Sequence, residues 1–198
     1  MAEIDFWYEF ASTYSYPAAM RIEAVATARG VAVNWRPFLL GPIFAENGWR
    51  DSPFNLYPLK GRYMWRDLER ICEAMNLPLR RPEPFPQNSL AAARIALSLE
   101  GRLRAEFSRA VYAAEFGEGR PIADREVLSG LIAAIGADPN STFAAAEASS
   151  NKDRLKSECA LARSIGVPGA PAVVTGDGEV FWGNDRLEQA VDWAQARG

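Results

Sequence analysis

The feature that most constrains the fold is a strand, helix and strand pattern within the first 37 residues. Apolar and polar side chains alternate from Ile4 to Phe10, the period of two that is typical of a strand. Apolar residues then follow a helical spacing until Gly30, and a second alternating run over 31–35 ends at Pro37. These elements make a βαβ unit, which predicts parallel pairing of the two strands with a right-handed crossover.

The rest of the chain divides into a helical middle and a return to strands. Prolines cluster at 52–58 and 78–86, and between such connections apolar residues recur at helical spacing. After Gly166, two short apolar runs flank a Gly-Asp-Gly turn at 176–178, which indicates a hairpin, and a last helix follows. The helices of the middle are expected at 61–76, 89–100, 102–116, 124–135, 139–148 and 152–165, with Asp124 and Asp138 as candidate N-caps.

This order of elements predicts an α/β fold of the thioredoxin-like kind. The two halves, βαβ and ββα, are separated by a large all-helical insertion. We expect the first half of the thioredoxin-like domain at 1–43, the insertion at 44–165 and the second half at 166–198.

Composition excludes several classes of function. The 198 residues contain no His, so Ser-His-Asp and Cys-His nucleophile pairs and His-ligated metal sites are excluded, and no metal is expected. A net charge of -3, from 22 Lys and Arg against 25 Asp and Glu, argues against nucleic acid as a partner.

The cellular location of the protein is inferred from its N-terminal residues, its apolar segments and its cysteines. The N-terminal residues include Glu3 and Asp5 where a signal peptide needs basic residues, and no stretch approaches 18 uninterrupted apolar residues. We therefore expect a cytoplasmic protein without a membrane partner. Cys72 and Cys159 lie far apart inside helical patterns, which predicts buried free thiols and no disulfide.

The junction between the first strand and the first helix is the most informative segment. In a thioredoxin-like fold, dithiol enzymes carry Cys-x-x-Cys there, whereas this chain has Ser12-x-x-Ser15 and its cysteines lie elsewhere. A helix N-terminus favours an anion, so one interpretation is that this segment binds the thiolate of a ligand. The alternative is that both serines only cap the helix.

Two further segments fall on the same predicted edge of the sheet. Pro171 opens the third strand, either in a cis bond with Ala170 facing the helix start or in an ordinary rigid turn. A ligand's extended peptide backbone could pair with Ala170 if the bond is cis. Before the last helix, Asn184 and Asp185 either receive the charged ends of a ligand, or Asp185 only caps that helix and Arg186 is only a solvated surface charge.

Together, six segments in order resemble the 2-hydroxychromene-2-carboxylate isomerases and the related kappa-class glutathione transferases, over nearly the whole chain. They are Asp5 to Phe10 leading into Ser12-x-x-Ser15, Arg36 to Gly41, Asn55 to Lys60 with Tyr63 and Asp67, Phe85 to Ser89, Gly166 to Pro171, and Phe181 to Leu187. The chain departs from the family pattern at Thr13, Pro17, Pro168 and Ala170.

The resemblance implies a glutathione site, a substrate site and a homodimer. Ser12 would be the catalytic serine beside the glutathione sulfur. Glutathione would be bound by Ser12, Ala170, Pro171, Trp182, Gly183, Asn184 and Asp185, and the substrate's carboxylate or phenol end by Asn55, Lys60 and Asn88.

The expected activity is glutathione-dependent cis-trans isomerisation of 2-hydroxychromene-2-carboxylate or a similar aromatic enone acid. Two alternatives stay open: a kappa-like transferase that conjugates glutathione to a small electrophile, and a non-catalytic thioredoxin-like binding module. Thr13 and Ala170 would lie beside the sulfur, so their departure from the family pattern bears on the choice of substrate.

Overall fold

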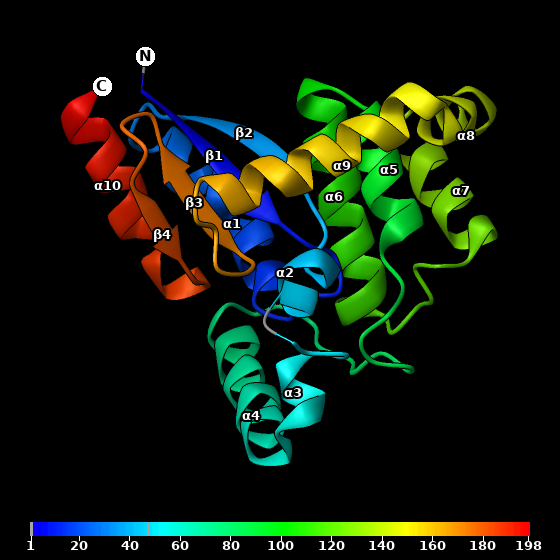
Figure 1. Cartoon of the computed structure of the whole chain (residues 1–198), viewed down its shortest axis with the longest axis horizontal. Helices are drawn as coiled ribbons and strands as arrows, with labels where there is room; N and C mark the ends of the chain where they lie inside the picture. The colour runs from blue at the N-terminus through cyan, green and yellow to red at the C-terminus, as the bar shows by residue number, and fades with distance from the viewer. Residues whose placement is uncertain (1, 47) are drawn as a thin grey trace.

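Strand β1 (Glu3–Tyr8) lies in the middle of the sheet (Figure 1). It pairs in parallel with β2 (Ala32–Pro37), to which helix α1 (Ser15–Thr27) connects it, and antiparallel with β3 (Ala172–Thr175). Strand β4 (Val180–Trp182) pairs antiparallel with β3, which gives the order β2-β1-β3-β4. The predicted parallel unit and the predicted hairpin are therefore confirmed.

The central strand is buried on both faces. Phe6 and Tyr8 pack against the ring of Trp35, with centroids 5.1 and 5.3 Å away. The other face carries Trp7, which is fully buried and lies under the guanidinium of Arg36 at 4.7 Å. The sequence pattern predicts one apolar face for this strand, whereas helices cover both faces of the sheet, so both faces are apolar.

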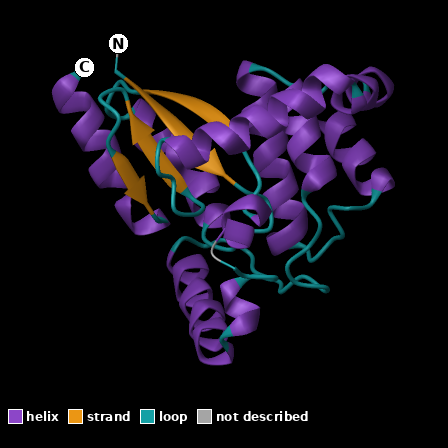
Figure 2. Ribbon diagram, in the orientation of Figure 1, coloured by secondary structure: helices purple, strands orange, loops and turns teal. Residues whose placement is uncertain are grey.

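Helices dominate the computed structural model, which describes residues 2–46 and 48–198 (Figure 2). The predicted helices are confirmed to within a few residues at their ends. None of the helices in the described residues is long and apolar enough to cross a membrane. After α1 they are α2 (Gly41–Glu46), α3 (Pro53–Leu56), α4 (Pro58–Ala74), α5 (Leu90–Ser98), α6 (Gly101–Tyr112), the π-helical turn η1 (Ala113–Gly117), α7 (Arg125–Ala134), α8 (Pro139–Glu147), α9 (Ser149–Ser164), the 3-10 turn η2 (Asn184–Arg186) and α10 (Leu187–Arg197).

The short helices α2 and α3 fall outside the predicted ranges. Each spans less than two turns, too few residues to show a helical repeat, and a proline stands at the start of each. The predicted caps of α7 and α8 are confirmed, because the Asp124 side chain accepts from the Glu126 N–H at 2.7 Å and Asp138 accepts from the Ser141 N–H at 2.8 Å.

The helical insertion shares its core with the sheet. Helices α5, α6 and α9 pack on β2, and α6 also packs on α1. A single cluster of buried apolar residues includes members from both the strands and the insertion. The positions near 44 and 165 at which the insertion begins and ends therefore stay a prediction.

Helices α3 and α4 form a hairpin that projects from the body of the molecule (Figure 1). Gly61 of α4 meets α3 so closely that a Cβ there would lie 2.3 Å from the Phe54 carbonyl oxygen. Met64, Leu68 and Cys72 form the buried side of α4. Met64 accepts a hydrogen bond from the Thr13 hydroxyl at 3.1 Å, which brings this hairpin to the start of α1.

Candidate functional site

Ser12 stands in the turn between β1 and α1. Its N–H donates to the Glu9 carbonyl at 3.0 Å, and its carbonyl accepts from the Ser15 N–H at 3.1 Å. Its hydroxyl donates to the Ala170 carbonyl at 2.8 Å. Helix α1 begins at Ser15 with Tyr14 as its N-cap residue and without a side-chain cap. The interpretation of Ser12 and Ser15 as capping side chains is therefore wrong, because Ser12 bonds across to a distant loop and Ser15 lies inside the helix.

The loop before β3 faces this turn. The Ala170–Pro171 peptide bond is cis, as one of the two alternatives for this segment predicts. The Pro171 carbonyl accepts from the Gly183 N–H at 2.9 Å, which ties the loop to the end of β4. Gly169 lies against Trp182, where an added Cβ would be 2.9 Å from the indole Nε1. The loop, Ser12 and the β4 end are therefore in direct contact.

The turn after β4 depends on a glycine. Gly183 has a φ of 115°, and a Cβ at this position would lie 2.5 Å from the Asp185 carboxylate. Trp182 is 57% exposed, and the Asp185 side chain is also exposed. Neither η2 nor α10 has a side-chain cap, so the interpretation of Asp185 as the cap of the last helix is wrong.

Asn184 has a different set of contacts from its neighbours. Its side-chain oxygen accepts from Arg21 Nε at 3.0 Å, and its backbone carbonyl accepts from Arg21 Nη2. Both carbonyl oxygens of Asn184 are thus bound within the protein. The neighbouring Asp185 carboxylate is exposed and accepts no hydrogen bond from the residues that the structure describes.

Tyr14 connects the helix start to the hairpin and to the β4 turn. Its hydroxyl donates to Asp67 Oδ2 at 3.0 Å. Burial raises the pKa of Tyr14, and the nearby carboxylates of Asp67 and Asp185 raise it further. Asp185 therefore lies within electrostatic reach of the residue two positions after Ser12.

The three predicted substrate residues each have local partners. The Asn55 amide donates to Asp51 at 3.0 Å and to the Phe85 carbonyl at 3.2 Å. The Lys60 ammonium lies 4.9 Å from the centre of the Tyr57 ring. The Asn88 side chain accepts from the Leu90 N–H at 3.0 Å, at the start of α5. The structure does not bring these three into hydrogen-bond contact with Ser12, and their role stays a prediction.

Thr13 is buried, and its hydroxyl is directed to Met64 at 3.1 Å. The expected place of Thr13 beside the ligand sulfur stays a prediction, and its hydroxyl is engaged by Met64. Ala170, by contrast, meets Ser12 directly through its carbonyl.

A buried pair of acids behind the turn was not singled out from the sequence. Glu9 is 5% exposed and its carboxylate accepts from the Ser89 hydroxyl, while its backbone carbonyl accepts from Ser12 and, at 2.9 Å, from Tyr112. Burial raises the pKa of Glu9 to about 7. Glu115, in η1, is fully buried, and within the described residues neither of its carboxyl oxygens has a hydrogen-bond partner.

The pKa of Glu115 depends on its burial and on its neighbour Glu9. Burial, and the negative charge of Glu9, raise the pKa of Glu115 well above its ordinary value. The only sequence signal for the pair is an acid at Glu9, where the strand leads into the candidate turn. Glu115 gives no local signal, because its burial depends on how the end of α6 packs against β1.

The chemistry open to this site is that of a hydroxyl donor beside a helix start. The two cysteines are free and buried, as predicted, and burial raises the pKa of Cys72 to about 11 and that of Cys159 in the same direction. Neither stands in the β1–α1 turn, so thiol chemistry here needs a sulfur supplied by a ligand. Ser12 and the N-terminal end of α1 both favour an anion at this place.

Comparisons with known proteins agree with the fold. The model of the DSBA-like thioredoxin domain family matches residues 3–193. The chain is 29% identical over 187 residues to a 2-hydroxychromene-2-carboxylate isomerase of Sphingobium xenophagum, covering 93% of this chain and 94% of that protein. It is 31% identical to glutathione S-transferase kappa 1 of Caenorhabditis elegans over 86 residues, 43% of this chain and 37% of that protein.

Among solved structures, that of a selenomethionine-labelled 2-hydroxychromene-2-carboxylate isomerase superimposes with a TM-score of 0.87 at 23% identity. The match covers 98% of this chain and 95% of the other. At this level of identity the likeness establishes the fold, including the thioredoxin-like sheet and its helical insertion.

Proposed function

Because the chain belongs to the DSBA-like thioredoxin domain family and carries Ser12 at the β1–α1 turn, we propose that it is a glutathione-dependent cis-trans isomerase. Its substrate would be 2-hydroxychromene-2-carboxylate or a similar aromatic enone acid. The similarity to proteins named as such isomerases supports this choice. The observation that carries it is the Ser12 hydroxyl, which donates to Ala170 beside Pro171, with both cysteines buried elsewhere.

The role of Ser12 is to donate a hydrogen bond to sulfur and not to attack the substrate. A free thiol has a pKa of about 8.5, and lowering it by about two units takes roughly 2.7 kcal/mol. A helix N-terminus supplies about 0.3–1 kcal/mol, while a hydrogen bond to a charged acceptor supplies about 1.5–3 kcal/mol. The hydroxyl is the larger contribution, and it needs no His to activate it.

The residues around Ser12 fit a small peptide carrying a thiol. Trp182 and Asp185 are exposed beside the turn, and α1 has no side-chain cap that an anion would have to displace. Glutathione would be held by Ser12, Ala170, Pro171 and the segment 182–185, with Asp185 facing its ammonium group. When bound, it supplies a thiolate that adds reversibly to the enone, so that the former double bond can rotate.

The substrate would be held by Asn55, Lys60 and Asn88. The Lys60 cation suits a carboxylate, and the two amides suit a phenol or carbonyl oxygen. Asn55 and Asn88 are linked through the segment before α5, since Asn55 donates to the Phe85 carbonyl. We also propose that the protein is a cytoplasmic homodimer, as the family resemblance implies.

The experiment is an isomerisation assay with Ser12→Ala and a matched serine variant, Ser164→Ala. The Ser164 hydroxyl bonds only within its own helix, to the Leu161 carbonyl at 2.9 Å. We expect glutathione-dependent isomerisation to fall by about a hundredfold in Ser12→Ala, the scale for loss of one oxyanion donor, and to stay unchanged in Ser164→Ala. An equal rate in Ser12→Ala would contradict the proposal.

A kappa-like transferase is the second candidate, favoured by the partial match to the kappa transferase. It would use the same serine, but the product would leave with the sulfur attached. The product mass separates the two: an isomer keeps the mass of the substrate, whereas a conjugate gains the mass of glutathione. A protein whose melting temperature does not change in millimolar glutathione would instead be a binding module of another kind.

A further inference from the structure

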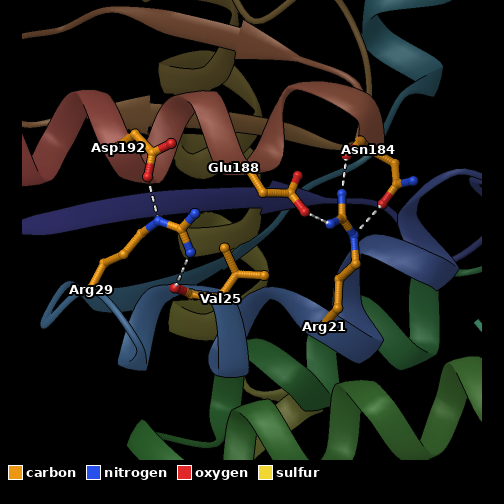
Figure 3. Close-up of polar contacts among 6 residues, drawn as sticks. All are labelled: Arg21, Val25, Arg29, Asn184, Glu188 and Asp192. Carbon is orange, nitrogen blue, oxygen red and sulfur yellow. Dashed lines mark hydrogen bonds and ion pairs between the residues drawn. The ribbon is translucent and has the colours of Figure 1, made fainter.

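Arg21 bridges the first helix of the sheet domain and the turn that precedes the last helix. It lies in the middle of α1, and its side chain is 21% exposed (Figure 3). Its Nε donates to the Asn184 side-chain oxygen at 3.0 Å, its Nη2 to the Asn184 backbone carbonyl, and its Nη1 to Glu188. One guanidinium therefore binds the backbone and the side chain of the same residue, as well as Glu188 in the first turn of α10.

The hydrogen bonds of Arg21 complete a closed series of contacts around the site. Ser12, just before α1, donates to Ala170. The neighbouring Pro171 carbonyl accepts from Gly183, which directly precedes Asn184. Arg21 then returns from Asn184 to α1. Asp185 is exposed, and within residues 2–46 and 48–198 its side chain has one ion-pair contact, with Arg186 at 3.9 Å. Its position therefore depends on the residues next to it in the chain.

We propose that Arg21 is a positioning residue, which fixes the turn bearing Asp185 relative to Ser12 and so sets the affinity for the γ-glutamyl end of glutathione. This inference rests on the proposed glutathione site. Asn184 is then the residue of the turn that Arg21 binds, since both carbonyl oxygens of Asn184 accept hydrogen bonds from Arg21. The planar fork of arginine makes several directed hydrogen bonds at once, which a lysine ammonium cannot reproduce.

The chain offers a matched control in Arg29, which lies in the turn just after the C-terminal end of α1. Arg29 pairs with Asp192 of α10 and donates to the Val25 carbonyl of α1 at 3.3 Å (Figure 3). It thus joins the end of α1 to α10 with the same kind of side chain, but it makes no hydrogen bond to the 183–186 turn. Both variants lose an ion pair to α10, whereas only the Arg21 variants lose the hydrogen bonds to the turn.

The test compares Arg21→Met, Arg21→Lys and Arg29→Met by calorimetric binding of glutathione and of cysteinylglycine, which lacks the γ-glutamyl group. Both Arg21 variants should bind glutathione about tenfold or more weakly, because a small displacement of a binding group is costly. Their affinity for cysteinylglycine and the pKa of the bound thiol should match those of the wild type. Arg29→Met should bind both ligands as the wild type does.

Amide hydrogen exchange without ligand gives a second readout. The Arg186 N–H donates to the Gly183 carbonyl at 3.2 Å, so it reports directly on the turn. Its exchange should become faster in Arg21→Met and not in Arg29→Met. Equal glutathione affinity and equal exchange in all variants would overturn the role of Arg21. Should the wild type not bind glutathione at all, the proposed function fails, and exchange alone then decides whether Arg21 holds the turn.

Discussion

The Ser12 hydroxyl donates a hydrogen bond to the Ala170 carbonyl over 2.8 Å, although 158 positions separate the two residues. The contact joins the end of the first strand to the loop before the third. It brings a serine to the place where dithiol members of the fold carry cysteine. The hydroxyl can turn from this carbonyl to a ligand atom without movement of the backbone.

Gly183→Ala is expected to destabilise the protein and to weaken glutathione binding. The residue has a φ of 115°, and its Cβ would meet the Asp185 carboxylate at 2.5 Å. Such a backbone conformation costs a non-glycine residue about 1–3 kcal/mol. The measurement is urea unfolding together with glutathione titration. Gly176→Ala is the control, since a Cβ there meets nothing within 4 Å. Equal stability of the two variants would contradict this account of the turn.

Two glycine-to-alanine variants in helices are expected to change stability in opposite directions. Gly61→Ala places a Cβ 2.3 Å from the Phe54 carbonyl oxygen and should destabilise the α3–α4 hairpin by about 1–3 kcal/mol. Gly130→Ala, within α7, has open space and should stabilise the protein by about 0.5–1 kcal/mol. Thermal unfolding of both variants tests this, and a Gly61→Ala protein as stable as the wild type would show that α3 and α4 are not packed as described.

The buried acids predict that stability falls as the pH rises from 5 to 8. Burial raises the pKa of Glu9 to about 7, above its value in the unfolded chain, so the folded state binds this proton more tightly. The contribution is fully present below the unfolded pKa and is lost as the pH rises through about 7. For Glu9 alone the loss approaches about 3 kcal/mol, and Glu115 acts in the same direction.

Glu9→Gln isolates the contribution of Glu9 to the pH dependence of stability, because the amide oxygen can still accept from Ser89 but does not ionise. The free energy of unfolding of the variant should fall less between pH 5 and pH 8 than that of the wild type. Urea unfolding at both values measures the difference. Identical pH dependence of the two proteins would mean that Glu9 titrates normally and is not a buried, proton-holding group.

Local sequence signals predict much of the fold and the contact between the β1–α1 turn and the loop before β3. The βαβ unit, the hairpin and the caps at Asp124 and Asp138 each depend on residues close together in the chain. The cis bond before Pro171 and its place beside Ser12 followed from the topology that these elements imply.

Contacts made by the tertiary packing were not predictable in the same way. The capping role of Ser12 is wrong because a carbonyl from the other half of the fold competes for its hydroxyl. The direction of the Thr13 hydroxyl depends on Met64, which belongs to a hairpin whose position no local pattern gives. The burial of Glu115 and the grip of Arg21 on Asn184 likewise depend on how separate helices meet.

The most direct test of the account is a pH titration of the thiolate absorbance of glutathione bound to the wild type and to Ser12→Ala. The account predicts that the bound thiol titrates about two pH units below free glutathione in the wild type, and at least one unit higher in the variant. A thiol pKa that is the same in both proteins, or that equals the value in free solution, would contradict the claim that the Ser12 hydroxyl stabilises a sulfur anion.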